Sequence, residues 1–132
     1  MNLTVIVPVF NEEKTLLEIL KRTNKLEKYC QLEIIVINDG SFDDSKNILD
    51  RNTHLYSKVI HLKNNSGKGK AVIEGLRNSS YEYVLIQDAD LEYNPNDIVE
   101  FIEENKKNNY DLIVGSRFIG NKRTILHFWH ML

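Results

Sequence analysis

Two aspartates one residue apart, Asp88 and Asp90, follow an apolar run that ends at Ile86. If the chain stays extended through Ala89, both carboxylates face the same side, because alternate residues of an extended chain share a face. Mg²⁺ and Mn²⁺ prefer oxygen ligands and are often held by one or two carboxylates together with oxygens of a substrate phosphate. The pair therefore predicts a site for Mg²⁺ or Mn²⁺. The alternative is that the acids cap a turn, although Asn94-Pro95 already provides a helix start.

Polar residues also follow other apolar runs of the chain. In open α/β sheets, the carboxyl ends of parallel strands meet at one edge, and ligands bind there. We therefore expect these polar groups to form one site with the two aspartates. They are the segments Phe10-Asn11-Glu12, Asn38-Asp39-Gly40-Ser41 and Gly115-Ser116-Arg117.

Asp39 and Arg117 each have two interpretations. Asp39 can accept hydrogen bonds from a nucleotide base or ribose, but Asp-Gly-Ser is also common turn and cap chemistry. The Arg117 guanidinium can grip a phosphate with two hydrogen bonds, or it can form a salt bridge to the acids.

A basic, glycine-containing segment, Asn65–Ala71, resembles a phosphate loop at first sight. Neither Lys68 nor Lys70 fits the P-loop spacing, because the required first glycine is replaced by Leu62 or Asn64. The dinucleotide fingerprint fails as well, since no glycine follows the first apolar run. What remains is a basic loop that opens a helix and can approach an anion, with a solvated turn as the alternative.

The apolar pattern predicts the elements that position these groups. Short, nearly continuous apolar runs are typical of strands covered on both faces, as in parallel sheets. Apolar residues at helical spacing lie between them. The expected strands are 3–9, 32–37, 58–62, 83–86 and 112–114. The expected helix faces are Leu16, Ile19, Leu20 and Thr23 behind an Asn11 cap, then Ile48 and Leu49, then Val72, Ile73 and Leu76, then Ile98, Phe101 and Ile102. We predict a three-layer α/β/α domain with a mostly parallel sheet.

Composition narrows the class of protein. A chain of 132 residues is enough for one domain, and a net charge of -2 gives no general basic surface for nucleic acid. The single cysteine, Cys30, indicates a reducing cytoplasm. No apolar run is long enough to span a bilayer, so we expect any membrane contact to be peripheral, at its inner face.

The last stretch carries an apolar stripe, and we expect it to be core or, if left uncovered, a surface for homo-oligomer formation. Its residues are Ile125, Phe128, Trp129 and Leu132. His127 and His130 lie three residues apart there, without a third ligand, and are expected on the surface.

Five segments in order resemble the family 2 glycosyltransferases of GT-A fold, and within them the dolichol-phosphate mannosyltransferase-like branch that uses polyprenyl phosphates. They are Val5–Glu13, Val36–Ser41, Gly67–Ala71, Gln87–Leu91 and Gly115–Phe118. The resemblance implies that Asp88 and Asp90, with Glu92 as a further candidate, hold Mg²⁺ or Mn²⁺, and that Arg117 meets a phosphate. It implies donor contacts from Pro8, Phe10, Asn11, Glu12, Ile37, Asp39, Gly67, Lys68 and Ala89.

The implied activity is metal-dependent, inverting transfer of a sugar from a GDP- or UDP-linked donor to an acceptor, a polyprenyl phosphate in that branch. Members of the branch continue past the Gly115-Ser116-Arg117 segment, so residues 1–132 are expected to form the donor-binding domain without the acceptor side. A donor-binding remnant or subunit without its own activity remains an alternative. A sugar-phosphate nucleotidyltransferase is a second one, but its glycine-rich loop is absent from positions 8–12.

Overall fold

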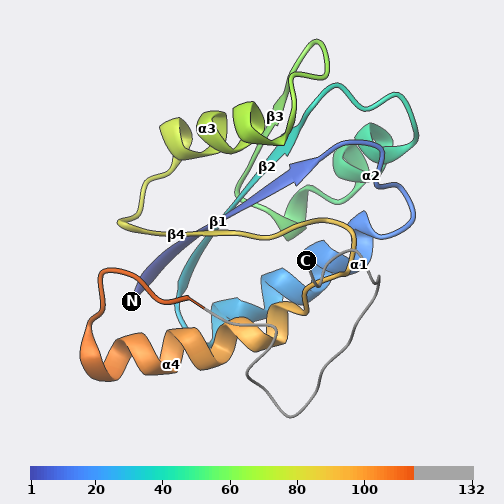
Figure 1. The fold of residues 1–132 in the computed structure, drawn as a ribbon. Helices are drawn as coiled ribbons and strands as arrows, with labels where there is room; N and C mark the ends of the chain where they lie inside the picture. Colours follow the sequence, from blue (N-terminus) through green and yellow to red (C-terminus); the bar gives the residue numbers. More distant parts are fainter. Residues whose placement is uncertain (115–132) are drawn as a thin grey trace, which may run out of the picture.

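Four parallel strands form the centre of the computed structural model, which describes residues 1–114 (Figure 1). The strands are β1 (Asn2–Val9), β2 (Gln31–Asn38), β3 (Lys58–His61) and β4 (Tyr83–Ile86). They lie in the order β3-β2-β1-β4, and every neighbouring pair is parallel. The four predicted strands up to residue 86 are confirmed.

Helices connect the strands and cover both faces of the sheet. They are α1 (Leu16–Asn24), α2 (Ser45–Arg51), α3 (Lys68–Asn78) and α4 (Ile98–Asn108), with short 3₁₀ turns η1 (Lys25–Lys28), η2 (Thr53–Leu55) and η3 (Pro95–Asp97). In Figure 1, α3 lies above the sheet, and α1 and α4 lie below it. The result is the three-layer α/β/α arrangement that the sequence predicts. Within residues 1–114, no helix has the length and apolar character needed to cross a membrane.

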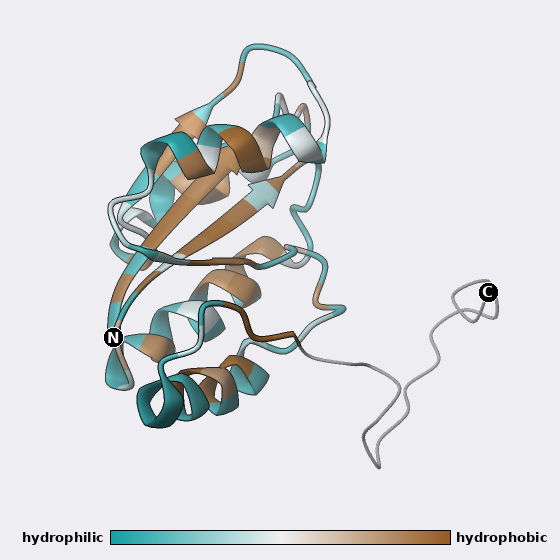
Figure 2. Cartoon of the chain, turned by 60° about the vertical axis from the view of Figure 1, so that its left-hand side comes forward, coloured by the Kyte–Doolittle hydropathy of each residue, from teal (hydrophilic) through white to brown (hydrophobic). Residues whose placement is uncertain are grey.

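The core is divided between the two faces of the sheet because side chains alternate along each strand. On the α1 and α4 face, odd-numbered β1 residues such as Val5 and Val7 pack against Leu16, Ile19 and Ile102. On the α3 face, Ile6, Ile35 and Ile37 pack against Ala71. Figure 2 shows the strands in the brown of apolar residues, between helices whose outer turns are hydrophilic. Two-sided burial explains why these strands read as continuous apolar runs.

The helix faces agree with the sequence pattern in α1 but not in α3. Leu16, Ile19, Leu20 and Thr23 are all buried, as expected. In α3 the buried residues are Ala71 and Gly75, whereas Ile73 and Leu76 are about half exposed. A Cβ at Gly75 would lie 2.5 Å from Cγ2 of Ile6, so α3 packs on β1 through small residues. The pattern failed here because close backbone approach selects small side chains rather than large apolar ones.

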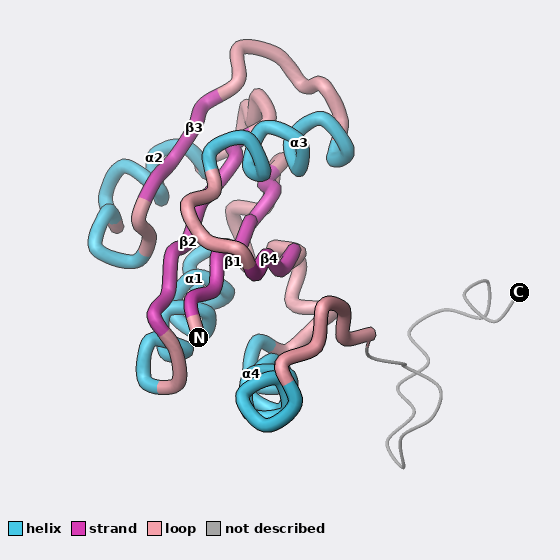
Figure 3. The backbone as a smooth tube through the Cα atoms, turned by 90° about the vertical axis from the view of Figure 1, so that its left-hand side faces the viewer, coloured by secondary structure: helices cyan, strands magenta, loops and turns pink. Residues whose placement is uncertain are grey.

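The predicted strand at 112–114 is wrong. These residues belong to the loop after α4 (pink in Figure 3), and the side chains of Leu112 and Val114 are more than three quarters exposed. A strand forms only by pairing, and within the described chain β4 pairs with β1 alone. Residues 112–114 are apolar, but they have no neighbouring strand within the described chain with which to pair. Arg117, the two C-terminal histidines and the apolar stripe lie outside the described residues.

Candidate donor site at the strand ends

A pocket of about 310 Å³ lies where the carboxyl ends of β1, β2 and β4 meet the start of α3. The strand ends are brought level by the sheet register, which pairs Val9 with Asn38 and Ile6 with Ile86. The pocket is lined by Pro8, Val9, Phe10, Glu12, Asp39, Asn65, Gly67, Lys68, Ala71, Asp88, Ala89 and Asp90. The structure thus brings together nine of the residues that the sequence singles out, and adds Val9, Asn65 and Ala71.

The loops that follow β1 and β2 are joined by reciprocal hydrogen bonds. The backbone N–H groups of Asn11 and Glu12 donate to the hydroxyls of Ser41 and Ser45, both at 3.0 Å. In return, the Asn11 side-chain oxygen accepts from the N–H of Phe42 at 2.9 Å. Asn11 is therefore a loop clamp and not the helix cap expected from the sequence; α1 begins only at Leu16. The clamp fixes the wall of the pocket that carries Phe10 and Glu12.

Asp39 is buried and holds the basic loop in place. Its Oδ1 accepts from the N–H of Ser66, and its Oδ2 from the N–H of Gly67, each at 2.8 Å. Gly40 (φ 70°) lies against the same loop, where a Cβ would come within 2.6 Å of the backbone at Asn64 and Asn65. The carboxylate of Asp39 therefore orders the segment that leads into α3. The sequence could not predict this contact, because Asp39 and Ser66 lie 27 residues apart in the chain.

Lys68 and Asp88 form an ion pair across the pocket. Lys68 is the first residue of α3, Asp88 lies two residues beyond β4, and Nζ to Oδ1 is 2.5 Å. The Asp88 side chain is 23% exposed and that of Lys68 is 59% exposed, so a ligand in the pocket can reach both groups. The ion pair places the only ammonium among the described pocket-lining residues directly beside one of the paired aspartates.

Asp90 and Glu12 complete the acidic side of the pocket. Asp90 is exposed, and its Oδ1 accepts from the N–H of Glu92 at 3.0 Å. Burial raises the pKa of Glu12, and the negative charges of Asp90, Asp43 and Asp88 raise it further, while a hydrogen bond from Thr15 lowers it. The Thr15 hydroxyl also donates to the carbonyl of Ala89, which ties α1 to the segment between the aspartates.

Some expected residues lie elsewhere. Ile37 is fully buried on the α3 face of the sheet, so its side chain does not line the pocket. Asn11 borders a neighbouring hollow of about 410 Å³, and Glu92 lies beyond the lining. Phe10 does line the pocket, and its ring meets that of Phe42 edge to face with centroids 5.8 Å apart. Phe42 itself is 84% exposed, a feature that the sequence did not single out.

Asp88 and Asp90 are the candidate ligands for a divalent cation. Among residues 1–114, no group of three or more His, Cys, Asp and Glu side chains is placed to hold a metal ion. Asp88 and Asp90 nevertheless line one pocket and offer oxygen ligands alone. Mg²⁺ and Mn²⁺ need only one or two carboxylates when a substrate phosphate supplies further oxygens. The residues therefore fit a cation that binds together with a phosphate ligand.

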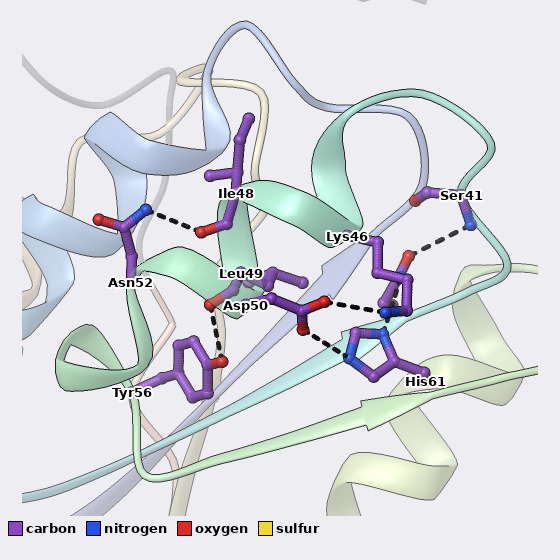
Figure 4. A network of polar contacts seen from close by, with 9 residues as sticks. Ser41, Lys46, Ile48, Leu49, Asp50, Asn52, Tyr56 and His61 are labelled. Atoms are coloured by element: carbon purple, nitrogen blue, oxygen red, sulfur yellow. Dashed lines mark hydrogen bonds and ion pairs between the residues drawn. The ribbon is translucent and has the colours of Figure 1, made fainter.

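A second polar network fixes the end of β2 beside the pocket. The buried amide of Asn38 bonds to Nδ1 of His61 at 3.0 Å and accepts from the N–H of Ser41 at 3.2 Å. Figure 4 shows the neighbouring groups, with Asp50 between Lys46 and His61. Asn38 thereby supports the turn that carries Asp39. The sequence did not predict this role, because it depends on contacts with His61 and Ser41.

The parallel sheet and the pocket at its carboxyl edge place the chain among the open α/β proteins, whose ligands bind at that edge. The sequence model of glycosyl transferase family 2 matches residues 4–132, and the chain belongs to this family. The chain is 36% identical over 126 residues to the poly-beta-1,6-N-acetyl-D-glucosamine synthase of Staphylococcus epidermidis, covering 94% of this chain and 30% of that protein. It is 31% identical over 119 residues to an uncharacterised protein of Methanocaldococcus jannaschii, covering 85% and 50%.

Solved structures show the same fold. TarS 1-349 of S. aureus in complex with UDP-GlcNAc aligns with a TM-score of 0.65 and 31% identity, covering 80% of this chain and 32% of that one. The mannosyltransferase PcManGT of Pyrobaculum calidifontis, in complex with GDP-Man and Mn²⁺, aligns at 0.61 and 29%, covering 67% and 27%. The chain therefore spans about a third or less of these solved chains. These matches identify the family and do not single out its dolichol-phosphate mannosyltransferase branch.

Proposed function

We propose that the pocket binds a nucleotide-diphosphate sugar and that the protein containing this domain transfers the sugar to an acceptor. One observation carries the proposal: Asp88, Asp90 and Lys68, from two separate strand-helix units, converge on a single pocket at the carboxyl edge of the sheet. Relatives of the chain were solved with UDP-GlcNAc and with GDP-Man and Mn²⁺, which supports a nucleotide sugar as the ligand class.

Each part of the pocket suits one part of such a donor. Asp88 and Asp90 would hold Mg²⁺ or Mn²⁺, which when bound would neutralise charge on the diphosphate. The N-terminal turn of α3, with Lys68, favours an anion because the helix dipole is positive there. Pro8 and Phe10 provide the apolar wall against which a base can lie.

The transfer follows from charge. The bond between the sugar C1 and the diphosphate oxygen breaks, and an acceptor oxygen forms the new bond at C1 from the opposite side, which inverts the configuration. The electron pair leaves with the nucleoside diphosphate, so catalysis requires positive charge where that leaving group lies. No nucleophile from the protein is needed. An anionic phosphate acceptor needs no base, whereas a hydroxyl acceptor does.

Two kinds of acceptor agree with this donor site. A polyprenyl phosphate, met at the inner face of the membrane, is the acceptor implied by the dolichol-phosphate mannosyltransferase-like pattern. A relative of the chain is named as a polysaccharide synthase, so a growing glycan is equally in keeping with the family. The family match favours glycosyl transfer over the sugar-phosphate nucleotidyltransferase. We propose residues 1–132 as the donor-binding domain, and activity of the domain alone is the point that separates an enzyme from a binding remnant.

Thermal unfolding tests the donor site. Addition of UDP or GDP with Mn²⁺ is expected to raise the melting temperature, because a ligand that binds only the folded state stabilises it. Asp90→Asn is expected to remove most of that rise. Asp111→Asn, at an exposed position in the loop after α4, is the matched control and should retain it. No rise with either nucleotide, or an equal rise in Asp90→Asn, would count against the proposal.

A further inference from the structure

We propose that Lys68 is an internal counter-ion: it occupies the Asp88 carboxylate while the donor is absent, and it gives up that carboxylate when a divalent cation and a diphosphate enter. This inference rests on the proposed function, because it describes how Lys68 in the same pocket changes its partner when the donor binds. It predicts that Lys68 opposes binding of the cation alone and assists binding of the diphosphate.

The first argument for this inference is the balance of charges in the pocket. Its lining contains four carboxylates, Glu12, Asp39, Asp88 and Asp90, and one ammonium, Lys68. Asp39 is buried and satisfied by two loop N–H groups, so it is committed to the loop. Lys68 is therefore the cation that the described lining offers to the remaining acids, and it is in contact with Asp88 at 2.5 Å.

The backbone before Lys68 is held by hydrogen bonds from another part of the chain. This distinguishes the Lys68–Asp88 pair from an ordinary surface ion pair. Asp39 fixes the N–H groups of Ser66 and Gly67, the two residues immediately before Lys68. Gly67 adopts φ 90° and ψ 154°, and the helix begins at the next residue. The backbone that carries Lys68 is thus held from the end of β2, while its partner Asp88 comes from the end of β4.

A divalent cation on the Asp88 carboxylate lies next to the Lys68 ammonium, and the two positive charges repel each other. This repulsion favours displacement of the ammonium from Oδ1, while the backbone held by Asp39 keeps the base of the Lys68 side chain at the pocket. A diphosphate that arrives with the cation then offers oxygens to that ammonium. Lys68 would therefore exchange one anionic partner for another.

Binding of Mn²⁺ alone, measured from the electron paramagnetic resonance signal of free Mn²⁺ at low ionic strength, tests the first half. Lys68→Met is expected to bind Mn²⁺ about two- to fivefold more tightly than the wild type, the range expected for loss of a partly exposed ion pair. Lys68→Arg keeps the charge and should match the wild type. Lys70→Met removes a charge two residues away, outside the pocket lining, and should leave Mn²⁺ binding unchanged.

Titration of UDP and GDP at saturating Mn²⁺ tests the second half. Lys68→Met is expected to bind the nucleotide that the wild type prefers about two- to fivefold more weakly, so the two affinities move in opposite directions. The side chain of Lys68 is largely exposed, and circular dichroism will confirm that each variant is folded.

The outcomes separate the inference from the proposed function. If the wild type binds neither nucleotide with Mn²⁺, the proposed function fails, whatever the variants do. If the wild type binds nucleotide but Lys68→Met binds Mn²⁺ alone no more tightly than the wild type, or no more tightly than Lys70→Met, the inference is overturned. Absence of Mn²⁺ binding in every variant also overturns it.

Discussion

Among single residues, Asp39 both lines the pocket and holds the neighbouring loop in place. The sequence left two roles open for it, a turn residue or an acceptor for the nucleotide. In the structure its carboxylate bonds to two backbone N–H groups of the basic loop. Neither role alone describes this, because the contact spans 27 and 28 residues and depends on the sheet bringing the two segments together.

Replacing Asp39 with asparagine should loosen the loop before α3. The amide oxygen can accept one N–H, but the NH₂ group would face the other N–H, and a buried unsatisfied donor is costly. We expect faster hydrogen exchange at the amides of Ser66 and Gly67, and a loss of about 1–3 kcal/mol of unfolding free energy. Asp111→Asn, at an exposed residue in the loop after α4, is the control for exchange at these amides. Unchanged exchange in Asp39→Asn would show that the carboxylate does not hold the loop.

Glu12 should make stability depend on pH. Its pKa is raised above the ordinary 4.5, so the folded chain holds this proton more tightly than the unfolded chain. Stability is therefore lost as the pH rises from about 4.5 through the raised value. Glu12→Gln removes that loss, and we expect it to be more stable than the wild type at pH 7 and equal to it near pH 4.

Urea unfolding from pH 4 to pH 7 measures this difference. Glu100→Gln, at an exposed position in the first turn of α4, provides a control outside the pocket. A Glu12→Gln variant whose stability relative to the wild type is the same at every pH would contradict the assigned electrostatic cause.

At the scale of elements, α3 depends on its small residues. Gly75 allows the helix to lie directly on β1, whereas nothing lies within 4 Å of a Cβ built at Gly69. Gly75→Ala should destabilise the fold by about 1–3 kcal/mol through overpacking against Ile6. Gly69→Ala should be neutral or stabilising by up to about 1 kcal/mol, because alanine favours helix. Denaturant unfolding of the two variants makes the comparison, and equal effects would mean that the helix does not pack as described.

The elements also show how much the sequence could predict. Four strands, the face of α1 and the Asn94-Pro95 start of η3 followed from local pattern, because two-sided burial and capping leave marks on neighbouring residues. The face of α3 and the loop at 112–114 did not. Packing through glycine and the presence of a strand partner are properties of the folded sheet, and local apolar spacing does not encode them.

At the scale of the whole molecule, the pocket is the meeting point of loops that are far apart in the chain. Their residue types were predictable, since polar groups at the ends of apolar runs have no role in the core. Their pairing was not: the Lys68–Asp88 contact and the Asp39 clamp depend on the strand order β3-β2-β1-β4. Ile37 shows the converse: it was predicted as a donor contact from the motif, and its side chain is fully buried in the core on the α3 face of the sheet.

The domain also has apolar surface that its own described residues leave uncovered. Ile73 and Leu76 of α3, and Val84 and Ile86 of β4, are all exposed by more than a third. The chain spans only about 30% of the length of the synthase that it resembles. The residues that line the pocket all lie within residues 1–114, so ligand binding can be tested on this chain.

The central claim is that a nucleoside diphosphate and a divalent cation bind together between Asp88, Asp90 and the start of α3. The most direct measurement is paramagnetic broadening of assigned amide resonances when Mn²⁺ is added with UDP or GDP. The amides of Lys68, Ala89 and Asp90 should broaden first, and those of Lys106–Asn108 last, because Asn105 contacts Met1 at the opposite edge of the sheet. Broadening centred elsewhere, or a pattern unchanged by Asp88→Asn, would contradict the account.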